Sequence, residues 1–282
     1  MLQIALPNQG TLSDAAIALV AEAGYRCSRA GRELCLPDAE NDVEFFFLRP
    51  RDIAVYVSQG VIDVGITGRD LNLDAAAPAA EIMPLGFGRS KFRYAVPRDS
   101  ELTPERFGGL RIACSYPNIV RRDLESRGVQ ATIIQVDGAV EVSIRLGVAD
   151  AVADVVDSGQ TLREAGLKTV GDVVMASEAV VIARSAETAA HPQVDKFLKR
   201  IHGIVVAREY AMIEYDIRRD LLDKAVLLTP GIEAPTISPL NDPAWVAVKS
   251  MAKKKGMNGL VDALADLGAK GIVVTDIRTC RL

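Results

Sequence analysis

The chain has 282 residues, of which 49% are hydrophobic and 25% are charged, and its formal net charge is −4. This length and composition predict about two domains with sizeable cores, with three small domains as the alternative. The acidic balance and the lack of a basic block argue against a nucleic-acid partner. No apolar run reaches the roughly 18 residues that a membrane helix needs, and the N-terminus lacks the features of a secretory signal, so we expect a cytoplasmic protein.

The residues that most often hold metals or disulfides are few and scattered. The four cysteines (Cys27, Cys35, Cys114 and Cys280) have no CxxC spacing, which predicts reduced thiols and not a metal site or a disulfide framework. The two histidines lie in no motif, so imidazole acid–base chemistry is not expected. No metal site built from protein ligands alone is predicted.

The first part of the chain repeats a pattern of strand, polar loop and helix. The N-terminal strand is followed by a turn, and Thr11 or Ser13 is a candidate cap for the first helix. Arg49 and Asp70 each follow a predicted strand at its carboxyl end, where open α/β sheets place ligands; two solvated loop charges are the alternative. The predicted elements are a strand over 2–6, a helix over 14–24, a strand over 44–48, a helix over 52–60 and a strand over 61–66.

The next part is expected to form a second lobe, entered over residues 86–96. Arg89, Lys91 and Arg93 alternate there, so a strand would present all three on one face. Attraction of phosphate and the solubility of an edge strand explain this pattern equally well. The predicted elements that follow are strands over 110–113 and 132–136 with a helix over 119–128 between them, strands over 170–174 and 179–184 that return to the first lobe, and a helix over 192–204.

Residues 141–162 are the most informative stretch. A short helix ending at Gly147 precedes a Val-rich segment, 148–156, typical of a strand buried on both faces of a parallel sheet. A small polar loop and a second helix follow. Unpaired helix N–H groups, the hydroxyls of Ser158 and Thr161, and a glycine that permits close approach together suit an anion. An ordinary turn with a Ser or Thr cap is the alternative, and the stretch contains neither GxxxxGK[ST] nor GxGxxG.

After about residue 204 the pattern changes to βαββαβ, which is the ferredoxin-like order. The strands are predicted within 205–217, 235–240, 245–252 and 272–277, and the helices over 218–228 and 258–268. We expect a separate small domain with its own core. Because no Gly- or Ser-rich linker precedes it, we expect this domain to pack on its neighbour. A regulatory domain and a dimerisation module are both compatible with this order, because a fold alone does not determine function.

The stretch 141–162 resembles the signature of the ATP phosphoribosyltransferase family, which opens histidine biosynthesis. The family pattern is a Glu, a Gly six residues on, a small residue, an Asp followed by an aliphatic residue, and then [ST]-G-x-T-[LM]. The matching residues are Glu141, Gly147, Ala149, Asp154, Val155, Ser158, Gly159, Thr161 and Leu162. The resemblance extends over the whole chain, and residues 229–240 are similar to the regulatory domain of the long form of the family.

The resemblance implies a fold and a set of sites. The fold is α/β: a two-lobed catalytic core like that of solute-binding proteins, with lobe I over 1–90 and 180–204, lobe II over 91–179, and a ferredoxin-like regulatory domain over 205–282. The implied catalytic residues are Glu141 and Asp154. The residues implied to bind phosphoribosyl pyrophosphate (PRPP) are Asp154, Asp157, Ser158, Gly159, Gln160 and Thr161. ATP is implied to meet Gln9, Gly10, Arg49 and Asp70, and inhibitory histidine to meet Asp216, Thr236 and Ser238.

The resemblance also implies partners and one departure. Mg²⁺ is the implied cofactor, carried on pyrophosphate oxygens, and a homodimer and a homohexamer are the implied assemblies. The family usually has a Lys or Arg in the first loop where Asn8 and Gln9 stand here, so that contact is expected to be polar but uncharged. Asp216 has an alternative role as the N-cap of the helix that follows it.

Two other classes of protein would have a similar pattern. A non-catalytic two-lobed protein that binds anions or nucleotides would have the same βαβ repeats and anion loop, but no appended ferredoxin-like domain. A regulatory subunit without activity would not need the complete signature. The sequence therefore favours a glycosyltransferase.

Overall fold

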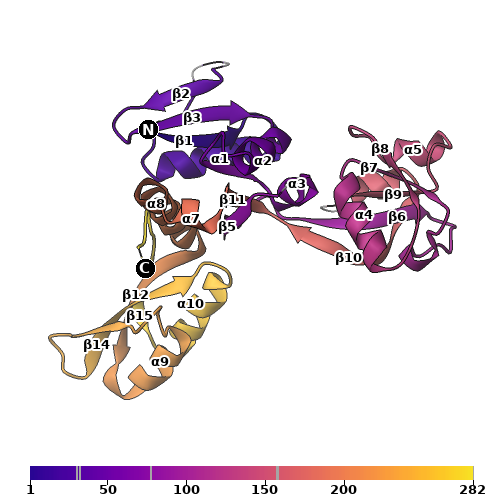
Figure 1. The fold of residues 1–282 in the computed structure, drawn as a ribbon. Coiled ribbons are helices and arrows are strands. Elements are labelled where there is room, and N and C mark those ends of the chain that lie inside the picture. The colour runs from indigo at the N-terminus through magenta and orange to yellow at the C-terminus, as the bar shows by residue number, and fades with distance from the viewer. Residues whose placement is uncertain (30, 32, 77, 157–158, 282) are drawn as a thin grey trace. The chain divides into compact units, whose positions relative to one another are not determined.

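The computed structural model describes residues 1–281 apart from 30, 32, 77 and 157–158. Its strands form three sheets of six, five and four strands, coloured in chain order in Figure 1. Residue contacts divide the chain into two compact units, 1–21 with 25–196 and 22–24 with 197–282. The first unit contains the six- and five-stranded sheets, and the second contains the four-stranded sheet.

The six-stranded sheet has the order β2-β3-β1-β4-β11-β5. Its central strands β1 and β4 are almost wholly buried, as their apolar runs predict, and Ile53, Ala54 and Val57 of α2 pack on one face of the sheet. The elements are β1 (Leu2–Pro7), α1 (Thr11–Glu22), β2 (Cys35–Asp38), β3 (Val43–Leu48), α2 (Pro50–Ser58), β4 (Val64–Gly68), α3 (Arg69–Asp74), β5 (Ala80–Pro84), β11 (Ala179–Ala183) and α7 (Ala186–Ala189).

The five-stranded sheet has the order β10-β6-β9-β7-β8, and the chain enters it after β5 and leaves it before β11. Alternate residues of β6 point to opposite faces, so Phe92 and Tyr94 join the core under α4, whereas Ala95 joins the core under α5 and α6. The elements are β6 (Ser90–Pro97), η1 (Pro104–Arg106), β7 (Arg111–Cys114), α4 (Pro117–Ser126), β8 (Thr132–Gln135), α5 (Val142–Arg145), β9 (Ala151–Val156), α6 (Gln160–Glu164) and β10 (Leu167–Ser177).

The four-stranded sheet has the order β13-β14-β12-β15, with every pair antiparallel. The helices α9 and α10 pack on one face against Ile213, Tyr215 and Val248. The elements are α8 (Pro192–Glu209), β12 (Tyr210–Arg218), η2 (Arg219–Leu221), α9 (Leu222–Leu228), β13 (Thr236–Pro239), β14 (Trp245–Lys253), α10 (Met257–Asp266) and β15 (Lys270–Asp276). This is the ferredoxin-like order that the sequence predicts, so the α/β fold class with its ferredoxin-like region is confirmed.

Several predictions about local structure are wrong. The buried strand begins at Ala151 and not at Val148, and the Asp150 carboxylate before it accepts hydrogen bonds from Arg111. The strand runs parallel to β7 but antiparallel to β6. Its last three residues are only half-buried. The helix α1 begins at Thr11, and the Ser13 hydroxyl donates to the carbonyl of Pro7 and does not cap the helix.

The elements that sequence reasoning missed are short or lie at sheet edges. They are β2, α3, β5, η1 and α7, none longer than six residues. Such segments carry too few residues for a hydrophobic period, and their neighbours decide their conformation. All four cysteines are free thiols, and no helix of the described residues is long and apolar enough to cross a membrane.

Candidate active site and neighbouring surfaces

The two predicted catalytic acids and the predicted phosphate loop line one cavity. Its volume is about 340 Å³, and it lies in the first unit where β9 ends and α6 begins. The described residues around it are Glu141, Asp154, Val155, Val156, Gly159, Gln160, Thr161 and Leu162. Asp157 and Ser158 were also predicted here but lie outside the described residues. Acids and loop are thus brought together as the signature suggests.

The fold positions each side of this cavity differently. Asp154 lies in the half-buried end of β9, directly opposite Arg93 of β6. Glu141 immediately precedes α5, and Thr161 lies in the first turn of α6. The neighbouring Leu162 is buried in the core between the sheet and these helices, which holds α6 against the end of β9.

The conformation of Gly159 explains why the loop has a glycine there. Its φ is +70°, a left-handed value that costs residues with a Cβ roughly 1–2 kcal/mol. A Cβ at this position would also lie 3.3 Å from Arg163 Nη1 and 3.5 Å from Val156 Cγ1. Gly159 itself is the N-cap of α6, and no side-chain hydrogen bond caps that helix among the described residues. Thr161 is therefore not the cap of the alternative interpretation, because it is already inside the helix; Ser158 lies outside the described residues.

Asp154 has unusual electrostatics for a carboxylate. Burial raises its pKa to about 6, the backbone N–H of Val155 opposes this shift, and the nearby Glu141 and Asp70 raise the pKa further. A carboxyl group of this kind exchanges its proton close to neutral pH, which is common at functional sites. Among the described residues, no group of three or more His, Cys, Asp or Glu side chains is arranged to hold a metal ion.

The four residues predicted to meet ATP occupy the carboxyl ends of β1, β3 and β4. Gln9 and Gly10 form the exposed turn after β1, and Arg49 is exposed between β3 and α2. Asp70 is buried in α3. Its carboxylate accepts a hydrogen bond from the Ser177 hydroxyl at 2.8 Å, and its backbone N–H donates to the Ser177 hydroxyl oxygen at 3.1 Å. The solvated-charge alternative is wrong for Asp70, because the structure uses its carboxylate internally.

A cluster around Asp74 was missed by sequence reasoning. The buried Asp74 carboxylate accepts from Arg51 at 2.6 Å and from the backbone N–H groups of Asn118 and Ile119 at the start of α4, at 2.8 and 3.2 Å. The Arg51 guanidinium also lies 5.2 Å from the ring centre of Tyr116, whose pKa is raised by burial and by Asp70. Pro117 at the first helical position signals the helix start, but nothing local indicates an acid 44 residues away.

The three residues predicted to meet histidine lie in the second unit on one face of its sheet. Ser238 pairs with Ala247, which in turn pairs with Asp216, so these positions form one row across β13, β14 and β12. Thr236 lies two residues before Ser238 and shares its face. This face is opposite the one that α9 and α10 cover. The N-cap alternative for Asp216 is wrong: Arg218 is the N-cap of η2, and Asp216 lies inside β12.

Family models, related sequences and solved structures all indicate the same family. The family model described as HisG: ATP phosphoribosyltransferase matches residues 49–203, and that described as HisG, C-terminal domain, matches 207–279. The ATP phosphoribosyltransferase of Salinibacter ruber is 54% identical, and that of Pseudarthrobacter chlorophenolicus 52%, each over 100% of both chains. A chain of the ATP phosphoribosyl transferase (HisG:HisZ) complex from Thermotoga maritima has a TM-score of 0.64 at 25% identity, covering 73% of this chain and 98% of its own.

Fold, cavity and relatives define a transferase of pentosyl groups with an α/β core and an appended ferredoxin-like domain. The chain belongs to the ATP phosphoribosyltransferase family, whose reaction opens histidine biosynthesis, and its C-terminal domain is that of the long form. The predicted family, enzyme class and histidine-biosynthetic function are therefore confirmed.

Proposed function

We propose that the cavity beside Asp154 binds PRPP and that the enzyme transfers its phosphoribosyl group to N1 of ATP. The observation that carries this proposal is the single cavity of about 340 Å³ that joins Glu141, Asp154 and the loop residues Gly159 to Thr161. PRPP needs donors for a 5-phosphate and acceptors for two ribose hydroxyls within a short distance. A loop of N–H groups beside two carboxylates supplies both kinds of group.

Each residue then has a defined part in binding. The N–H groups and hydroxyl of the loop from Asp157 to Thr161 hold the 5-phosphate, and Gly159 allows that phosphate to approach the backbone. Asp154 and Glu141 accept hydrogen bonds from the ribose hydroxyls. Because Asp154 has a pKa of about 6, it is mostly ionised at pH 7 and above and can favour positive charge on the sugar.

The chemistry is a displacement that requires no protein nucleophile. The lone pair of adenine N1 forms a bond to C1 of the ribose while the C1–O bond breaks, and pyrophosphate leaves with the electron pair of that bond. The sugar carbon gains positive character as the leaving group gains negative charge. The carboxylates of Asp154 and Glu141 stabilise the first change, and holding both substrates at one site supplies proximity.

Mg²⁺ fits the donors that line this cavity. The two carboxylates of Glu141 and Asp154 are the hard oxygen ligands that Mg²⁺ takes, and their mutual repulsion contributes to the raised pKa of Asp154. An ion held beside these carboxylates would supply positive charge to neutralise the leaving group. We propose Gln9, Gly10, Arg49 and Asp70 as the ATP-binding set, with Asn8 and Gln9 as uncharged substitutes for the basic residue usual in the family.

The second unit supplies the proposed regulation. Free histidine would bind on the face of the four-stranded sheet, with Asp216 meeting a cationic group and Thr236 and Ser238 donating hydroxyls. The row of paired positions from Ser238 to Asp216 supports this proposal. We also propose the domain bounds 1–90 with 180–204, 91–179 and 205–282, assembly as a homodimer and a homohexamer, and a cytoplasmic location.

Release of pyrophosphate tests the reaction directly. Wild type should release pyrophosphate only when ATP, PRPP and Mg²⁺ are all present. Asp154→Asn should lose most turnover, whereas the matched control Asp172→Asn, which removes an exposed charge from β10 of the same sheet, should retain it. Equal turnover in both variants would refute the assignment of Asp154, and release without ATP would refute the reaction.

A further inference from the structure

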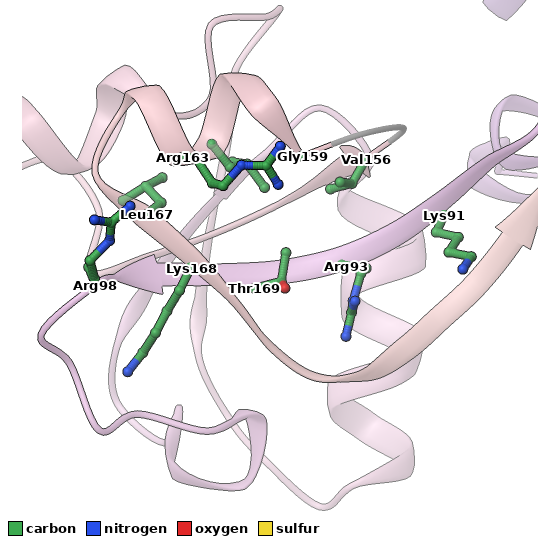
Figure 2. A pocket seen from close by; sticks show the side chains of 10 residues that line it. Lys91, Arg93, Arg98, Val156, Gly159, Arg163, Leu167, Lys168 and Thr169 are labelled. Carbon is green, nitrogen blue, oxygen red and sulfur yellow. The ribbon is translucent and has the colours of Figure 1, made fainter.

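A second cavity shares Gly159 with the proposed phosphate loop and is lined by basic side chains. Its volume is about 430 Å³. Figure 2 shows Arg98 and Lys168 towards one end, Lys91 at the other, and Arg93 and Thr169 between them, with Arg163 beside Gly159. The described residues that line it include no acid; they are Lys91, Arg93, Arg98, Val156, Gly159, Leu162, Arg163, Leu167, Lys168 and Thr169.

The position of β6 removes the simplest explanation for these charges. The strand β6 is flanked by β10 and β9, so it is an internal strand, and its Lys91 and Arg93 do not protect a sheet edge. The solubility alternative from the sequence is therefore wrong for these two residues. The cations instead lie on two adjacent strands: Lys91, Arg93 and Arg98 in or just after β6, and Lys168 in β10.

Among the described residues, four of the cations that line this cavity form no ion pair, although Asp154 of β9 lies opposite Arg93 in the strand register. They are Lys91, Arg93, Arg98 and Lys168. The Arg93 guanidinium donates to the carbonyl of Gly171 at 2.9 Å, but its Nε is buried and has no hydrogen-bond partner. A buried donor without a partner costs free energy, as does the proximity of like charges, and an anion in the cavity would relieve both costs.

We propose that this basic cavity is a binding site for an oligophosphate, separate from the PRPP cavity. The cations extend along two strands and offer more donors than the terminal oxygens of one phosphate can accept, so a linear chain of phosphates fits better than a single one. The cavity shares Val156, Gly159 and Leu162 with the proposed PRPP cavity. The proposal does not depend on what the neighbouring cavity binds.

Calorimetric titration with inorganic tripolyphosphate tests the site on the full chain. Replacing Arg98 and Lys168 together, as Arg98→Gln and Lys168→Gln, should weaken the affinity at least tenfold, because each removes a charge-assisted hydrogen bond. The control Arg106→Gln with Arg145→Gln removes the same charge from exposed positions that do not line the cavity. It should leave the affinity within about twofold, because these two charges do not line the cavity and solvent and salt screen their effect on it. Inorganic monophosphate should bind wild type more weakly than tripolyphosphate.

A third variant separates the two cavities. Thr161→Ala alters only the proposed PRPP cavity and should retain tripolyphosphate binding at the basic site. Absence of tripolyphosphate binding to wild type, or equal weakening by both double variants, would overturn the proposal. The proposal would also be overturned if Thr161→Ala lost tripolyphosphate binding while the variant with Arg98→Gln and Lys168→Gln kept it. Pyrophosphate release from ATP and PRPP is measured on the same samples. It tests the proposed reaction separately, so failure of the basic-site proposal can be distinguished from failure of the proposed function.

Discussion

Replacing Asp154 with Asn should raise stability and reduce activity in the same protein. Burial raises the pKa of this carboxyl from 3.8 to about 6, a shift that corresponds to about 3 kcal/mol at about 1.36 kcal/mol per unit. An acid whose pKa is raised by folding binds protons more tightly in the folded state. Its ionisation therefore destabilises the fold as pH rises through 6, and the cost is absent below about pH 3.8.

Urea unfolding at two pH values measures this cost. Asn keeps the shape of the side chain without the charge. At pH 8 we expect Asp154→Asn to exceed wild type in free energy of unfolding by up to about 3 kcal/mol, and at pH 4.5 by only about 1 kcal/mol. The pH-dependent effects of groups that do not interact with Asp154 are common to both proteins and cancel in the difference. A variant less stable than wild type at pH 8, or an equal gain at both pH values, would contradict the buried, repelled carboxylate.

The activity of the same variant should change in the opposite direction. If the ionised carboxylate assists the developing positive charge on the sugar, wild-type kcat/KM should fall as pH decreases through about 6. Asp154→Asn should have a low kcat/KM with no limb in that range. A variant with wild-type turnover and the same limb would assign the titration to another group and leave Asp154 with a structural role only.

Three further predictions concern the loop, the effector face and the buried acid at α4. Gly159→Val should raise the KM for PRPP strongly in initial-rate assays, because φ is +70° and the cavity wall is close; Thr161→Ala should lose about 1.5–3 kcal/mol of PRPP binding by calorimetry, and normal binding in both would refute the loop assignment. Asp216→Ala should retain catalysis but lose inhibition by histidine, whereas Asp220→Ala, which removes an exposed acid in η2, should retain both; superimposable dose–response curves for Asp216→Ala and wild type would place the effector elsewhere. Asp74→Ala should cost about 1–3 kcal/mol in urea unfolding, because it leaves two backbone donors at the start of α4 without their acceptor, whereas the half-exposed Arg51 can be solvated; a loss well below about 1 kcal/mol would show that water replaces the carboxylate.

The sequence alone was sufficient wherever the information is local. The residues from Glu141 to Leu162 are contiguous, so their pattern identified the family before any contact was known. The strand β1 was predicted from its apolar run, because a strand buried on both faces needs apolar residues throughout, and the helix α4 was predicted in the segment that follows the predicted strand over 110–113 and its loop. The ferredoxin-like region was predicted from the order of its elements alone.

Only the tertiary structure decided features that depend on residues far apart in the chain. Asp70 meets Ser177 across 107 residues and Asp74 meets Asn118 across 44, and neither partner leaves a local pattern. The direction of β9 against β6 and the internal position of β6 are properties of strand pairing, which removed edge protection as a reason for Lys91 and Arg93. The raised pKa of Asp154 likewise results from packing, because burial and the approach of Glu141 and Asp70 exist only in the folded chain.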